Sequence, residues 1–175
     1  MQNKESFVED NSGGSAAQFL TFHLAEERYA IDVKKIHEVL EVPRITRVPR
    51  MPDFVSGVMN LRGNVIPVMD LRLKFGLGRT TISDETSIVV TEISDVFTDE
   101  ESSSLEIGIF SDAVDQVVEI PLEDIEPPPS IGTSIDTSFI RGMGRIGDEF
   151  VIILKLEGLL SEKELFDYQE SGGEL

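Results

Sequence analysis

The sequence predicts an all-β protein, and two observations carry this prediction. Short segments alternate between apolar and polar residues, which is the period of half-buried strands, and residues typical of turns separate them at close spacing. Segments with helical spacing are few and brief. Many short strands with few helices are typical of a β-barrel or a β-sandwich. A chain of 175 residues, 40% of them hydrophobic, is long enough to bury such a core.

The first part of the chain predicts a hairpin followed by short helical segments. Residues 18–24 alternate, and residues 29–31 return after a turn. Asp32 is suited to cap a short helix over residues 33–40. Pro52 and Asp53 predict the start of a second short helical turn, which contains Phe54, Val55 and Val58.

The remaining elements are predicted as strands joined by turns. Residues 61–64 form a tight turn in this prediction, because Gly63 is free to adopt a positive φ. A strand follows at 65–69, and its Pro67, which has no amide hydrogen, is expected at a sheet edge or a bulge. Further strands are expected at residues 87–93, 105–110, 117–120, 139–146 and 150–156, the last two as a hairpin.

The connections and ends complete the prediction. Residues 95–104 are polar and charged, which indicates a long exposed loop, and the prolines at 127–129 predict a stiff extended connector. Ser161 and Glu164 form a capping box for a C-terminal helix that runs to residue 168. We expect residues 1–17 and 169–175 to be flexible tails.

The net charge of -18 has an uneven distribution. Residues 26–79 carry ten basic and seven acidic residues, whereas residues 80–140 carry fifteen acidic residues and no Lys or Arg. The acidity argues against nucleic acid and against an anionic membrane surface as partners, because both require concentrated positive charge. Because the N-terminus lacks a signal-peptide pattern and the apolar runs are too short to span a bilayer, we expect a cytoplasmic protein without membrane insertion.

Residue chemistry favours a binding module over an enzyme. There is no Cys, and His23 and His37 lack metal-ligand spacing, so we expect no metal, no cofactor and no catalytic residue. Residues 142–147 match the spelling GxGxxG, but a nucleotide fingerprint requires a helix after it, and a strand is predicted there. Glycines that permit strand twist are the better interpretation, and a nucleotide binder stays as an alternative.

Arg62 lies in the predicted turn at residues 61–64, between two apolar segments. One interpretation is a solvent-facing turn residue. The other is a guanidinium that a rigid turn holds against a groove or a partner, because arginine is enriched at interface hot spots. Residue chemistry alone favours neither.

The segment GVMNLRGNVIPVMDLR, residues 57–72, strongly resembles the signature of the CheW family of bacterial chemotaxis coupling proteins. The likeness extends through residues 19–22 and 27–32 as an opening hairpin and through 36–39 as a first helix. It continues at 46–49 and 52–57, and at 137–144 and 150–154 as a last hairpin. It implies one domain over residues 18–168, built from two packed five-stranded Src-homology-3-like β-barrels, with short helices and a C-terminal helix. The barrels are expected at about 18–80 and 81–156, with strand exchange between them left open.

The resemblance also implies a function. The protein would be a non-catalytic adaptor that couples the cytoplasmic tip of methyl-accepting chemotaxis receptors to the regulatory domain of the histidine kinase CheA, in arrays at the inner face of the membrane. The alternative from the same fold is a coupling protein of a related array that does not serve chemotaxis. Much of the acidity, and with it the loop at 95–104, would belong to the second barrel.

Family roles map onto matching positions of this sequence. The receptor-binding positions are Val33, Ile36, Glu38, Val39, Val58, Leu61 and Arg62. The kinase-binding positions are Val42, Ile45, Val48 and Gly57 on the first barrel, and Pro127 and Ile131 on the second. We further expect Glu38 and Arg62 to form an ion pair at the edge of the receptor groove.

Overall fold

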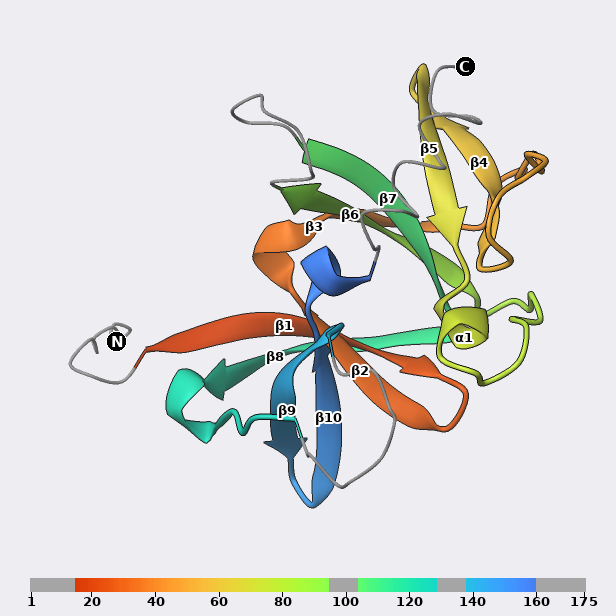
Figure 1. Cartoon of the computed structure of the whole chain (residues 1–175). Helices are drawn as coiled ribbons and strands as arrows, with labels where there is room; N and C mark the ends of the chain where they lie inside the picture. The colour runs from red at the N-terminus through yellow and green to blue at the C-terminus, as the bar shows by residue number, and fades with distance from the viewer. Residues whose placement is uncertain (1–14, 95–103, 129–137, 160–175) are drawn as a thin grey trace.

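The computed structural model describes residues 15–94, 104–128 and 138–159, and within them two five-stranded sheets with little helix (Figure 1). Sheet A has the order β8 (Ala113–Pro121), β1 (Ala16–Leu24), β2 (Glu27–Asp32), β10 (Glu149–Leu154), β9 (Ile140–Ile146). Sheet B has the order β3 (Ile36–Glu41), β6 (Ser87–Ser94), β7 (Ser104–Ser111), β5 (Asn64–Met69), β4 (Val55–Leu61). The short helices are η2 (Val33–Lys35), α1 (Leu71–Lys74), η3 (Leu122–Asp124) and η4 (Leu156–Gly158). The predicted all-β class with two five-stranded units is confirmed.

Some predicted elements lie outside the described residues, namely residues 1–14 of the first tail, the second tail, the helix at 161–168 and most of the loop at 95–104. The last two residues of the predicted first tail, Ala16 and Ala17, belong instead to β1. In the part of the chain that the structure describes, no helix is both long and apolar enough to cross a membrane.

The two sheets have equivalent topologies and exchange one strand each. In sheet A, β2 of the β1–β2 hairpin pairs in parallel with β10 of the β9–β10 hairpin. In sheet B, β7 of the β6–β7 hairpin pairs in parallel with β5 of the β4–β5 hairpin. The strand after each central hairpin crosses over, so that β3 pairs with β6 and β8 pairs with β1. The expected division at about residues 80 and 81 left strand exchange open, and β3, β4 and β5 share a sheet with β6 and β7. An alternating pattern of residues indicates a strand but does not show which other strand it pairs with.

The main hydrophobic cluster lies between the sheets. It combines Phe22 and Ile31 of sheet A with Ile107 and Ile109 of sheet B, each with no exposed side chain. Smaller clusters fill the other side of each sheet. Residues 88–91 of β6 are consequently buried without interruption, since both faces of this strand are covered.

The predicted helix at 33–40 is wrong beyond its first turn. Asp32 caps as expected, and its carboxylate accepts a hydrogen bond from the Lys34 amide at 2.9 Å. The helix nevertheless ends at Lys35, and Ile36–Glu41 continues as β3. Pairing with β6 overrides the helical spacing of Ile36, Val39 and Leu40, and within the strand the burial alternates from residue to residue.

Two further local predictions are corrected. The chain turns after Pro52, where the Val55 amide donates to the Pro52 carbonyl at 2.9 Å, but Val55–Leu61 is strand β4 and not helix. Pro67 lies in β5, which is an inner strand and not an edge. It is tolerated there because the ladder from β5 to β7 involves only the next two residues, Val68 and Met69.

Hydrogen bonds to the Asp112 carboxylate connect the β1–β2 turn of sheet A to helix α1, which follows β5 of sheet B. The carboxylate of Asp112 accepts from the Arg72 guanidinium at 3.0 Å and from the Ala25 amide at 2.7 Å. Arg72 also donates to the Leu77 carbonyl at 3.0 Å. The β1–β2 turn, helix α1 and the β7–β8 junction are thereby fixed to one another.

Candidate functional site

The two edge strands of sheet B meet through an ion pair. Glu38 lies on edge strand β3, and Arg62 lies in the turn that follows edge strand β4. The Arg62 guanidinium donates to the Glu38 carboxylate, which confirms the predicted pair. A second link forms nearby, where Thr46 and Val58 exchange two backbone hydrogen bonds of 2.8 Å. These contacts join the two edges of sheet B and close it into a barrel.

The turn that carries Arg62 is a two-residue hairpin connection. Leu61 pairs with Asn64, and the two central residues have φ of 52° at Arg62 and 89° at Gly63. This conformation suits the right-handed twist of paired strands but favours Asn or Gly over a residue with a long side chain. Arg62 therefore occupies a strained backbone position that directs its guanidinium to β3.

The apolar receptor candidates divide between two surroundings. Ile36 of β3 packs against the cluster between the sheets, whereas Leu61 packs against the cluster inside sheet B. Val58 is 8% exposed and supports the site from within, but Val39 is 42% exposed. Val33 is half-buried in η2. We call the half-buried and exposed members on these two edges the β3–β4 edge surface, which comprises Ile36, Glu38, Val39, Leu61 and Arg62.

A cluster beside Glu38 was not predicted from the sequence. Glu92 and Glu106 face each other across β6 and β7, and the His37 ring lies between their carboxylates. The His37 Nε2 is 2.8 Å from Glu92, and Nδ1 contacts Glu106. A bulge in β3 between Ile36 and Glu38 accompanies this arrangement. The sequence contains no pattern that predicts this bulge.

Hydrogen bonding shifts the pKa values of two residues in this cluster. The bonds to Glu106 and then Glu92 raise the pKa of His37 above its ordinary value of 6.5. The pKa of Glu92 is lowered, first by a hydrogen bond from Ser104 and then by His37. Each ring nitrogen of His37 contacts a different carboxylate. Within the described residues, no group of His and acidic side chains is placed to hold a metal.

The kinase candidates lie in two places. Val42 and Ile45 pack against the cluster inside sheet B, and Val48 follows in the same loop. Pro127 is exposed next to the bridge between Glu126 and β9 of sheet A. Ile131 lies outside the described residues.

Gly57 is buried and cannot itself present a surface. Its φ is 151°, and a Cβ built on it would lie 2.2 Å from the Thr46 carbonyl oxygen and 2.9 Å from an Ile45 methyl carbon. Gly57 therefore allows the Ile45–Thr46 segment to cross β4 closely, and positions the residues around it.

The GxGxxG spelling at 142–147 occupies strand β9 and the turn to β10. A Cβ at Gly142 would lie 2.7 Å from the Glu126 carbonyl oxygen, and Gly147 has a φ of 62°. These glycines permit a close backbone approach and a tight turn. The helix that a dinucleotide site needs is replaced by strand β10.

Comparison with known proteins decides the family. The CheW-like domain model matches residues 18–164. The chain belongs to the CheW family. The chemotaxis protein CheW of Helicobacter pylori is 35% identical over 154 residues, which cover 88% of this chain and 86% of that protein. The chemotaxis protein CheW of Klebsiella aerogenes is 32% identical over 148 residues, which cover 85% of this chain and 84% of that protein.

A solved structure agrees with the sequence comparison. The crystal structure of the scaffolding protein TtCheW from Thermoanaerobacter tengcongensis matches with a TM-score of 0.74 and 35% identity. The match covers 90% of this chain and 96% of that one. Sequence and fold together support a coupling role in chemotaxis, that of an adaptor.

Proposed function

We propose that this chain couples the cytoplasmic tip of chemotaxis receptors to the histidine kinase CheA, without catalysing a reaction. The observation that carries the proposal is the Glu38–Arg62 ion pair, which joins the edges of sheet B and is adjacent in the chain to Val39 and Leu61. The proposal takes the receptor to bind the β3–β4 edge surface and the kinase to bind the loop that holds Val42, Ile45 and Val48. Pro127 and Ile131 would form a second kinase contact.

The chemistry of the edge surface suits an amphipathic helix. An apolar stripe on a receptor helix would bury Val39 and Leu61, which are exposed and half-buried respectively. The Arg62 side chain is 70% exposed while it pairs with Glu38, so it is free to hydrogen-bond a partner as well. The strained backbone of Arg62 favours a role in binding, because strain of about 1–3 kcal/mol is typically retained at functional positions.

Substitution of Arg62 tests the receptor part of the proposal. We expect Arg62→Ala to fold normally, because an exposed ion pair contributes about 0–1 kcal/mol, and to lose binding to receptor-tip fragments in co-sedimentation. Arg145→Ala is the matched control, since Arg145 is exposed on β9 of sheet A, where it lies over the Phe150 ring. Unchanged receptor binding by Arg62→Ala would contradict the assignment.

The ternary complex tests the function as a whole. The wild-type chain should co-sediment with receptor-tip fragments and CheA of its own organism, and should increase the amount of kinase in the pellet. Failure to form this complex at protein concentrations of tens of micromolar would overturn the coupling function.

A further inference from the structure

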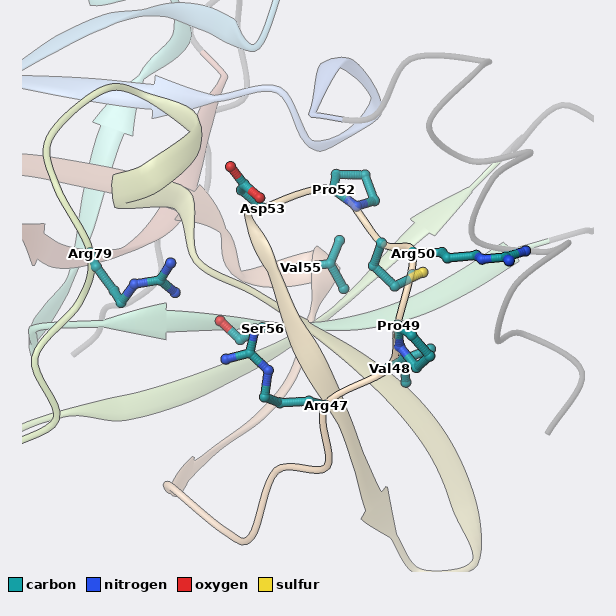
Figure 2. A pocket seen from close by; sticks show the side chains of 10 residues that line it. Arg47, Val48, Pro49, Arg50, Pro52, Asp53, Val55, Ser56 and Arg79 are labelled. Atoms are coloured by element: carbon teal, nitrogen blue, oxygen red, sulfur yellow. The ribbon is translucent and has the colours of Figure 1, made fainter.

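A cavity lined by arginines lies beside the start of β4. Its volume is about 380 Å³, and the loop before β4, the first residues of β4 and Arg79 line it. Figure 2 shows the side chains of Arg47 and Arg79 extending to the side of Ser56, whereas Arg50 extends the opposite way. Val48, one of the kinase candidates, is part of the same lining.

The cavity is a positive site on a strongly negative protein. Residues 42–82 contain seven basic and two acidic residues, although the chain carries a net charge of -18. Arg28, Arg62, Arg72 and Arg141 each pair with an acidic side chain. Among the residues that the structure describes, Arg47, Arg50 and Arg79 have no such partner. The cavity lining therefore holds three cations that form no ion pair with a described residue and one acidic residue, Asp53, and Arg47 and Arg79 extend to the same side of it.

Hydrogen bonds fix the backbone that carries these arginines. The bridge from Thr46 to Val58 holds the residue before Arg47. The buried Asp70 holds the other wall, since its carboxylate accepts from the amide and hydroxyl of Thr80 at 2.9 and 2.7 Å. The Asp70 amide donates to the Phe54 carbonyl at 2.6 Å, so that the loop at Arg79 and the start of β4 are joined. The cavity is thus formed before a partner arrives.

The lining favours an acidic peptide segment over a small anion. Val48, Pro49, Pro52 and Val55 provide apolar walls between the charged groups, as at protein interfaces, where arginine is enriched. Asp53 also lines the cavity and would repel a compact polyanion such as phosphate. A guanidinium is suited to a single carboxylate, which it binds through two parallel hydrogen bonds.

We propose that this cavity binds an acidic segment of the partner kinase, with Arg47 and Arg79 as the groups that take its carboxylates. The inference rests on the proposed function and deepens it: the apolar residues Val42, Ile45 and Val48 supply contact area, and the adjacent arginines select a partner with negative charge. Electrostatic selection of this kind acts mainly on the association rate and on the salt dependence of binding.

Charge reversal at the cavity is the direct test. The dissociation constant for CheA is measured at low and at high NaCl concentration for the wild type, Arg47→Glu, Arg79→Glu and the double variant. Lys155→Glu is the matched control, because Lys155 is exposed after β10 of sheet A, outside the loop proposed to bind the kinase, and does not line the cavity. We expect each cavity variant to weaken binding about tenfold at low salt, the double variant more strongly, and the control little. The salt dependence of the double variant should be flatter than that of the wild type.

The outcomes separate this inference from the proposed function. If the wild type binds CheA and the double variant binds equally well, the cavity assignment fails while the coupling function stands. If the wild type does not bind CheA, both fail. Calorimetry with inorganic phosphate and the sedimentation of the protein alone at low salt test other occupants. Binding of phosphate that the double variant loses, or self-association that it loses, would overturn the assignment to the kinase.

Discussion

Replacement of Gly57 by alanine should destabilise the protein through a single backbone crossing. The new Cβ would lie 2.2 Å from the Thr46 carbonyl oxygen, which is too close to be relieved by a side-chain rotation. The crossing segment must move away, which breaks the two 2.8 Å hydrogen bonds between Thr46 and Val58. Two backbone hydrogen bonds contribute about 2 kcal/mol together, and a strained φ costs about 1–3 kcal/mol more for a residue with a side chain.

The expected loss is therefore about 3–5 kcal/mol, or a decrease in Tm on the order of 10 °C for a chain of this length. Differential scanning calorimetry measures the decrease, and hydrogen exchange at the amides of Thr46 and Val58 locates it. Because the same crossing positions Ile45 and Arg47, the variant should also bind the kinase more weakly.

Gly63→Ala is the control for this reasoning. Gly63 has a φ of 89°, so alanine is strained there too, but no heavy atom lies within 4 Å of its built Cβ. Only the conformational cost applies, which is about 1–3 kcal/mol. An equal decrease in Tm for the two variants would show that backbone conformation alone matters at Gly57 and that the close crossing does not.

Three further predictions concern the rest of the fold. The His37→Gln variant should be less stable than the wild type mainly below pH 6.5. The pKa of His37 is raised in the folded state, so its protonated form stabilises the fold fully at pH values below the pKa of the unfolded state. This stabilisation is lost as the pH rises through the pKa of the folded state. Urea midpoints between about pH 5 and about pH 9 measure this difference, and a constant difference would contradict it. Arg72→Ala should cost about 2 kcal/mol in urea unfolding, because Asp112 loses a charged hydrogen bond in a partly buried site, and Arg44→Ala should not. Ile109→Ala should cost about 2–5 kcal/mol in the same assay, since the side chain is fully buried between the sheets, whereas Ile82→Ala, at a position 58% exposed, should cost little.

Most strands were predictable because they have a local signature, whereas β3 and β4 were not. Residues 18–24, 65–69, 87–93 and 105–110 alternate or form short apolar runs between turns, and each lies within an observed strand. The order of the strands was not predictable, because pairing depends on contacts between distant segments. The error at β3 has the same origin: Ile36, Val39 and Leu40 have helical spacing, and pairing with the distant strand β6 overrides it.

The site was predictable only in part. The Glu38–Arg62 pair followed from family resemblance and is present, whereas residue chemistry alone left Arg62 undecided. The His37 cluster depends on the register of β6 and β7 and on a bulge in β3, which bring three residues together from distant positions. The excess of basic over acidic residues in 26–79 is consistent with the arginine cavity. A count of charges, however, does not show that Arg79 lies near Arg47.

Strand exchange also changes what the net charge means. The acidic stretch at 80–140 was expected to belong largely to one barrel, yet it supplies β6 and β7 to sheet B and β8 to sheet A. Glu92 and Glu106 therefore lie on the same sheet as the arginine cavity, while Asp115 and Glu119 lie on the other. Neither sheet has one sign of charge. A partner that approaches sheet B meets acidic residues beside His37 and cations near Arg47, so the position of its own charges determines how it can dock. Binding in the correct orientation then requires the partner to carry charges opposite to both the acidic residues and the cations. A uniformly acidic surface would not distinguish one orientation from another.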